Sequence, residues 1–208
     1  MAADTTAGVL FLHGWNSSKR GYLPRAAAVS ADCGAECLAF DLSGHGENAS
    51  ARADSFSPSQ HLEEAVAAYD ELAARENVDP QRIGVCGASY GGYLAALLVG
   101  RRPVASLMVR APALYPDANF ELPPAQRRTE LVAAADARPL RNLAAFGGPV
   151  LVVESERDEV IPPGVVAAYV ASRPGIRHEV IPGAAHAISE PAWNEAYLAL
   201  ILEWARAL

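Results

Sequence analysis

The chain has 208 residues, of which 51% are hydrophobic and 20% charged, which is ordinary for a globular protein with a single core. A formal net charge of -7 argues against nucleic acid and anionic membranes as partners, because both attract clustered lysine and arginine. No apolar run reaches the roughly 18 residues of a membrane span, and the start lacks a signal-peptide pattern, so we expect a cytoplasmic protein.

The three cysteines, Cys33, Cys37 and Cys86, are too few and of odd number for a disulfide framework. No Cys-x-x-Cys or Cys/His spacing indicates zinc. We therefore expect three small buried hydrophobic residues, with a bridge between Cys33 and Cys37 as the alternative.

Apolar runs of strand length alternate with runs of helical periodicity along the chain. We expect strands at 7–12, 36–41, 82–86, 104–109, 150–154 and 176–181, with a turn at 78–80 before the third. We expect helices at about 22–32, from Pro58 with Ser57 as its cap, at 92–99, at 162–171, and from Pro191 onward. This alternation predicts an α/β fold, a three-layer α/β/α sandwich around a mainly parallel sheet of about six strands.

Residues 111–148 form a longer irregular segment between two strands, with five prolines and one predicted helix at about 124–135. A segment of this length is usually a lid or a substrate loop. We expect a single domain over residues 1–208, with 111–148 as a candidate lid or substrate loop.

The motif Gly87-Ala88-Ser89-Tyr90-Gly91 lies between a predicted buried strand and a predicted buried helix. A direct passage from strand to helix forces the serine into a strained backbone region, and side chains two positions away on either side would collide. Ser89 would then stand at the carboxyl end of the sheet, with the backbone N–H of Tyr90 directed at the same point. Helix-capping glycines around a capping serine are the alternative interpretation.

A serine hydroxyl needs a positioned base, and the base needs an acid that fixes its tautomer. His186 is the predicted base, because it follows the last strand and its neighbours are small. The other histidines lie in tight loops, a helix or a strand: His13, His45, His61 and His178.

Asp158 is the predicted acid, because it follows the fifth strand by four residues; a solvated loop carboxylate is the alternative interpretation. Glu154, at the strand end itself, and Asp117, in the candidate lid, are the reserves. The chain order Ser89, Asp158, His186 is the one that accompanies this serine motif in α/β-hydrolases.

The chain resembles the α/β-hydrolase superfamily over nearly its whole length, in four motifs that occur in family order. They are His13-Gly14-Trp15, the segment from Asp41 to Gly46, the Ser89 motif, and the acid and histidine loops. The resemblance implies that the backbone N–H groups of Trp15 and Tyr90 form an oxyanion hole, and that His13 and the turn at 44–46 are structural. Relative to the fuller family pattern the chain begins at the third strand and has no large cap, which implies an open site.

The resemblance implies a serine hydrolase that cleaves acyl esters through an acyl-enzyme, with no metal or organic cofactor. A carboxylesterase acting on small or medium substrates is our first choice, because the motifs fix the acyl chemistry but not the leaving group. The alternatives are a thioesterase, a small-peptide or amide hydrolase, and a catalytically silent binding protein of the same fold. We expect a small-molecule acyl substrate and a monomer or a homodimer. Candidate pocket walls are Trp15, Tyr90 and Tyr115, together with Tyr22 and Met108.

Overall fold

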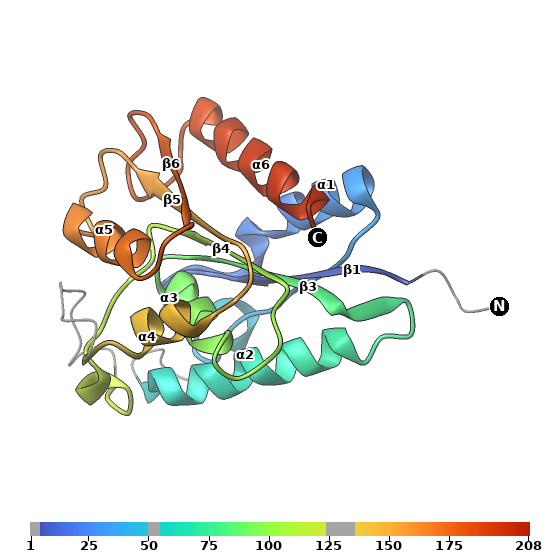
Figure 1. Cartoon of the computed structure of the whole chain (residues 1–208), viewed down its shortest axis with the longest axis horizontal. Coiled ribbons are helices and arrows are strands. Elements are labelled where there is room, and N and C mark those ends of the chain that lie inside the picture. The colour runs from blue at the N-terminus through green and yellow to red at the C-terminus, as the bar shows by residue number, and fades with distance from the viewer. Residues whose placement is uncertain (1–4, 50–54, 124–135) are drawn as a thin grey trace.

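A computed structural model describes residues 5–49, 55–123 and 136–208 of the chain (Figure 1). Its centre is a six-stranded sheet in the order β2-β1-β3-β4-β5-β6, and every neighbouring pair of strands is parallel. The strands are β1 (Thr6–Leu12), β2 (Glu36–Ala39), β3 (Val78–Ala88), β4 (Ser106–Arg110), β5 (Val150–Ser155) and β6 (Arg177–Ile181). Because all strands run the same way, the loops after them gather at one edge.

Helices cover both faces of this sheet, which confirms the predicted three-layer α/β sandwich. The helices are α1 (Leu23–Cys33), α2 (Pro58–Ala73), α3 (Tyr90–Leu98), α4 (Arg138–Ala145), α5 (Pro163–Ala171) and α6 (Pro191–Arg206). Figure 1 shows α1 and α6 together on one side of the sheet, with α2 and α3 on the other. The apolar side chains of α4 and α5 belong to the same buried cluster as those of α2 and α3.

The strand residues alternate between two separate cores, as the period of two in a β-strand requires. Leu10 and Leu12 of β1 pack with α2 and α3, whereas Val9 and Phe11 pack with α1 and α6. The central strand β1 is therefore apolar on both faces, which is why its residues read as a continuous hydrophobic segment.

Three features differ from the sequence predictions. The helix α4 was not predicted, and the helix predicted at about 124–135 lies outside the described residues. The turn predicted at 78–80 belongs to β3, where the pairing shifts from Thr6 with Val78 to Gly8 with Ile83, so the intervening residues bulge out. Cys33 and Cys37 are only partly buried free thiols, and Cys86 alone has the predicted burial.

The first turn of α2 is closed by a capping box. The Ser57 hydroxyl accepts a hydrogen bond from the Gln60 N–H at 3.3 Å, and the Gln60 side chain accepts one from the Ser57 N–H at 2.9 Å. Two backbone donors that the helix itself cannot satisfy are thereby paired.

We predict that Ser57→Ala lowers the free energy of unfolding by about 1 kcal/mol, because it removes the acceptor from the capping box. Urea denaturation with Ser57→Asp as the control measures this effect, since aspartate keeps a capping oxygen. Equal stability of the alanine and aspartate variants would show that the box contributes nothing to the stability of α2.

Candidate active site

Ser89 occupies a strained turn between β3 and α3. Its φ of 53° and ψ of -119° lie in a region that side chains with a Cβ rarely adopt. A Cβ on Gly87 would lie 2.3 Å from the carbonyl oxygen of Gly91, and one on Gly91 would lie 2.1 Å from the carbonyl oxygen of Leu12. Both glycines are therefore required by backbone contacts, and the strained serine predicted from the sequence is confirmed.

The turn is held by hydrogen bonds to the neighbouring strand and loop. The Ser89 N–H donates to the carbonyl oxygen of Arg110 at 2.9 Å, and the Ser89 carbonyl accepts from the N–H groups of Tyr93 and Ala113. These bonds fix the backbone in a conformation that it would not otherwise adopt.

The structure brings Ser89, Asp158 and His186 together in one hydrogen-bonded chain. Ser89 Oγ lies 3.0 Å from His186 Nε2, and His186 Nδ1 lies 2.8 Å from Oδ2 and 3.0 Å from Oδ1 of Asp158. An ionised carboxylate can only accept hydrogen bonds, so the imidazole proton is on Nδ1. Nε2 is then free to accept the serine hydroxyl proton, as a base must.

Asp158 is held in its charged form by the protein. Its side chain is 5% exposed, and burial alone raises the pKa of a carboxyl group. The hydrogen bond from His186 and those from the backbone N–H groups of Ile161 and Val160, both at 2.8 Å, outweigh burial and hold the pKa of Asp158 below its usual range. The carboxylate is therefore ionised at neutral pH and is oriented by these hydrogen bonds.

The loop after β1 packs directly against Ser89. A Cβ on Gly14 would lie 3.4 Å from Ser89 Cβ, so Trp15, the next residue, follows immediately beside the serine. His13 Nε2 accepts from the Leu42 N–H at 3.1 Å, and its Nδ1 therefore donates to the Gly14 carbonyl at 2.8 Å. Through these two hydrogen bonds, His13 fixes the conformation of the loop after β1.

The remaining histidines and the reserve acids are engaged away from Ser89. His61 lies between the Ser43 carbonyl and the Tyr90 hydroxyl, and the His45 Nδ1 is 3.0 Å from the same carbonyl.

The two reserve acids are paired with other side chains. His178 Nε2 and Glu154 Oε2 lie 2.8 Å apart, between the neighbouring strands β6 and β5. Asp117 accepts from the Arg138 N–H and pairs with Arg141, at the start of α4.

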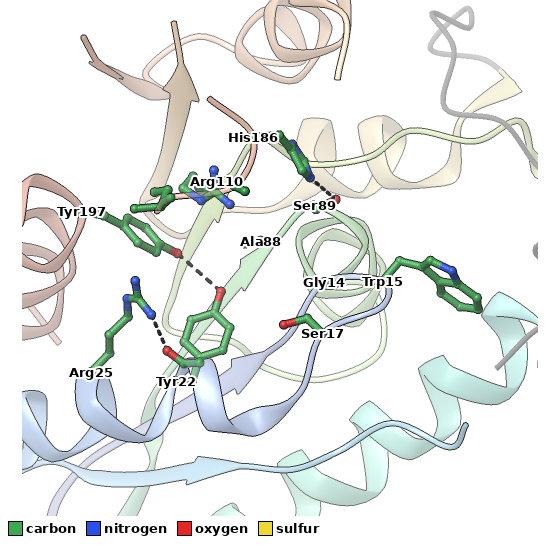
Figure 2. A pocket seen from close by; sticks show the side chains of 13 residues that line it. Gly14, Trp15, Ser17, Tyr22, Arg25, Ala88, Ser89, Arg110, His186 and Tyr197 are labelled. Carbon is green, nitrogen blue, oxygen red and sulfur yellow. Dashed lines mark hydrogen bonds between the residues drawn. The ribbon is translucent and has the colours of Figure 1, made fainter. Parts of the chain in front are cut away.

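A cavity of about 290 Å³ opens beside Ser89 and His186 (Figure 2). Trp15 and Tyr22 line it, as the sequence predicts. The Tyr90 side chain is buried against His61, Met108 is fully buried, and Tyr115 packs edge-on against Tyr93, so these three are not among the described lining residues. No described residue of the segment 111–148 lines the cavity either, and its role as a lid stays a prediction.

Among the residues of the cavity wall that the sequence analysis missed, three have large polar side chains. Arg25 of α1, Arg110 of β4 and Tyr197 of α6 converge on the side of Ser89 opposite Trp15 (Figure 2). The predicted fourth strand ended at Val109, one residue before Arg110. A charged residue directly after a buried strand was the signal that could have identified Arg110.

In the part of the chain that the structure describes, no three His, Cys, Asp or Glu side chains are grouped so that they could hold a metal ion. No helix among the described residues is long and apolar enough to cross a membrane.

Comparison with known proteins gives the family. Residues 3–135 match the family described as serine aminopeptidase, S33. The uncharacterized protein Rv2307c of Mycobacterium tuberculosis strain H37Rv is 29% identical over 177 residues, which are 82% of this chain and 60% of the relative. The chain thus spans about 60% of the length of the curated relatives that it matches.

Solved structures share the fold at lower identity. A monoacylglycerol lipase of Paleococcus ferrophilus matches with a TM-score of 0.74 and 17% identity, covering 98% of this chain and 96% of the lipase. A structure from the description of LipS and LipT, two metagenome-derived lipolytic enzymes, matches with a TM-score of 0.74 and 22% identity, covering 100% of this chain and 96% of its own. Since the family match extends over more than half of the sequence, the chain belongs to the serine aminopeptidase S33 family of α/β-hydrolases.

Proposed function

We propose that the protein is a serine hydrolase that cleaves a carboxylic ester through an acyl-enzyme intermediate. The observation that carries this proposal is the continuous relay from Ser89 Oγ through His186 to Asp158, at 3.0 and 2.8 Å, in the wall of a cavity. Such a relay converts an alcohol into a nucleophile by removing its proton as the new bond forms.

In the acylation step, Ser89 Oγ attacks the substrate carbonyl carbon while its proton passes to His186 Nε2. The backbone N–H groups of Trp15 and Tyr90 are the proposed donors to the developing oxyanion, because Tyr90 follows Ser89 and begins α3, and Trp15 follows Gly14, which packs against Ser89. The imidazolium is stabilised by the Asp158 carboxylate and returns its proton to the leaving alcohol.

In the deacylation step, water takes the place of the alcohol. His186 removes a proton from the water as its oxygen attacks the acyl carbon, and the same proton is then delivered to Ser89 Oγ. The carboxylic acid is released and the serine is regenerated.

An ester is favoured over the peptide suggested by the family description because of the charges in the cavity. An aminopeptidase binds a substrate with a free, cationic amino terminus. The fixed charges among the described lining residues are the guanidinium groups of Arg25 and Arg110, which repel a cation. The lipase and lipolytic enzymes of the same fold are consistent with an ester substrate, and thioesters and amides remain the alternatives within this mechanism.

We predict that a fluorophosphonate probe adds once to the folded wild-type protein and does not add to Ser89→Ala. Among the described residues that line the cavity, Ser89 is the only serine with a base within hydrogen-bond distance, so it alone should be activated. Intact-mass spectrometry measures the adduct, and Ser17→Ala is the matched control because Ser17 lines the same cavity. No adduct on the folded wild type would favour a binding protein of the same fold.

We predict that Asp158→Asn lowers kcat by a factor on the order of 10³ to 10⁴, because the amide no longer fixes the imidazole proton on Nδ1. Glu154→Gln, at the reserve acid, should change kcat by less than about a factor of two, since Glu154 contacts His178 rather than His186. Steady-state kinetics on a chromogenic ester distinguish the two carboxylates. The opposite ranking would assign the acid to Glu154.

We predict that activity falls as the pH decreases from neutral toward 4, because an imidazole base acts only when it is neutral. The low pKa of Asp158 keeps its carboxylate charged across this range, so the loss at acid pH should reflect a single ionisation until the pH approaches 4. The profile of kcat/KM from pH 4 to 9 tests this. Constant activity down to pH 4 would rule out a histidine base.

A further inference from the structure

One wall of the cavity is formed by a buried arginine at the end of β4. Arg110 is 7% exposed, and β4 pairs with β3 so that Arg110 lies beside Ala88, the residue before Ser89. The alternation of side chains along the strand turns Arg110 to the same face of the sheet as Met108, beneath α6. The guanidinium group therefore faces the cavity from a rigid element next to the nucleophile.

The contacts of Arg110 leave its charge unbalanced. Its Nη1 donates to the Ser155 hydroxyl at 2.8 Å, and its guanidinium lies 5.5 Å from the centre of the Tyr197 ring. Its Nε is buried without a hydrogen-bond partner, and no carboxylate within residues 5–49, 55–123 and 136–208 forms an ion pair with it. A buried arginine is normally paired with an anion, because desolvation of an isolated charge is costly.

A second arginine approaches the same cavity from α1. The Arg25 guanidinium lies 5.2 Å from the centre of the Tyr197 ring and 5.8 Å from that of Tyr22. It donates to the carbonyl of Gly21 and to the Asn194 side chain, both uncharged, and its Nε is also buried without a partner. Among the described residues, neither arginine in the cavity is neutralised by an acidic side chain.

Two tyrosine hydroxyls lie between these cations. The Tyr22 and Tyr197 oxygens are 3.5 Å apart, as drawn in Figure 2. Burial raises the pKa of both phenols well above its usual value, so both remain protonated and able to donate hydrogen bonds. This side of the cavity thus presents positive charge and hydrogen-bond donors.

We propose that the substrate is an ester that carries a carboxylate on one of its two halves, and that Arg110, assisted by Arg25, binds this carboxylate while Ser89 attacks the ester carbonyl. The planar guanidinium group matches a carboxylate with two parallel hydrogen bonds. Figure 2 shows Arg110 and Arg25 on the Tyr197 side of Ser89, away from Trp15. The carboxylate half of such a substrate would therefore contact the arginine wall, and the other half would lie toward Trp15. This inference rests on the proposed ester hydrolysis and specifies its substrate class.

The test compares esters that differ only in charge. For a carboxylate on the acyl half, the pair is 4-nitrophenyl hydrogen adipate and 4-nitrophenyl methyl adipate. For a carboxylate on the leaving group, the pair is 4-acetoxybenzoate and its methyl ester. In at least one pair, we expect kcat/KM for the charged ester to exceed that for the neutral ester by about 10- to 100-fold, the effect of hydrogen bonds to a charged group.

Arg110→Met should reduce this ratio to about one, because it removes the charge and keeps most of the volume. Arg110→Lys should give an intermediate ratio, since it keeps the charge but not the paired donors. Arg25→Met, at a partly exposed position, should lower the ratio by a smaller factor. Arg82→Met is the control, because Arg82 is an exposed residue that donates to the carbonyl of Leu208. A ratio near one in wild type for both pairs, or a ratio unchanged in both methionine variants, would overturn the proposal.

Calorimetric titration of adipate separates this inference from the proposed function. Wild-type protein should bind adipate, and Arg110→Met, checked for folding by circular dichroism, should bind it at least 10-fold more weakly. If no ester is cleaved and Ser89 is not labelled, the ester-hydrolase proposal fails, while this titration still decides the carboxylate site. Absence of adipate binding to the wild type would then overturn the site as well.

Discussion

The structure depends on the close approach of two backbones, that of the turn around Ser89 and that of β1. The position of Gly91 leaves no room for a Cβ beside the Leu12 carbonyl, and Gly87 leaves none beside Gly91 itself. These contacts hold α3 against the sheet and force Ser89 to a positive φ. The strain is balanced by three backbone hydrogen bonds of Ser89, two of them to residues at or beyond the end of β4. The position of the serine oxygen is therefore set by contacts and hydrogen bonds of the backbone.

The other two members of the relay reach Ser89 only because all strands are parallel. Asp158 follows β5 and His186 follows β6, and neither strand is hydrogen-bonded to β3, at whose end the serine lies. The alignment of Asp158 and His186 with Ser89 depends on a series of hydrogen bonds, each of which orients the next group. Two backbone N–H groups fix the carboxylate, the carboxylate fixes the imidazole tautomer, and the tautomer leaves Nε2 as the acceptor for the serine proton.

The sequence predicts those parts of the site that depend on backbone geometry, because glycine spacing and strand ends are local signals. Ser89, Asp158 and His186 each follow a strand that hydrophobic patterning identifies, and the structure places them within hydrogen-bond distance. Arg110, Arg25 and Tyr197 are different, since each is an ordinary residue in its own element. Only the packing of α1 and α6 over the end of β4 brings them together. Of the three, only Arg110 has a local signal, a charge directly after a predicted buried strand, and the meeting of the three side chains leaves no pattern in the sequence. The direction of the Tyr90 side chain also depends on tertiary packing. The sequence analysis therefore assigned Tyr90 to the pocket, although its ring packs into the core against His61.

The charge of the whole chain and the charge of its cavity have opposite signs, and they act over different distances. A net charge of -7 repels an anion at long range, but ordinary salt screens this repulsion beyond about 10 Å. Inside the cavity the two guanidinium groups act at contact distance, where charge interactions are stronger. The proposed selection of a carboxylate would therefore act after the substrate enters the cavity and not through attraction to the surface. Because both arginines lie on the side of Ser89 that faces Tyr197, the groups proposed to bind the anion would also orient the proposed ester carbonyl toward the serine.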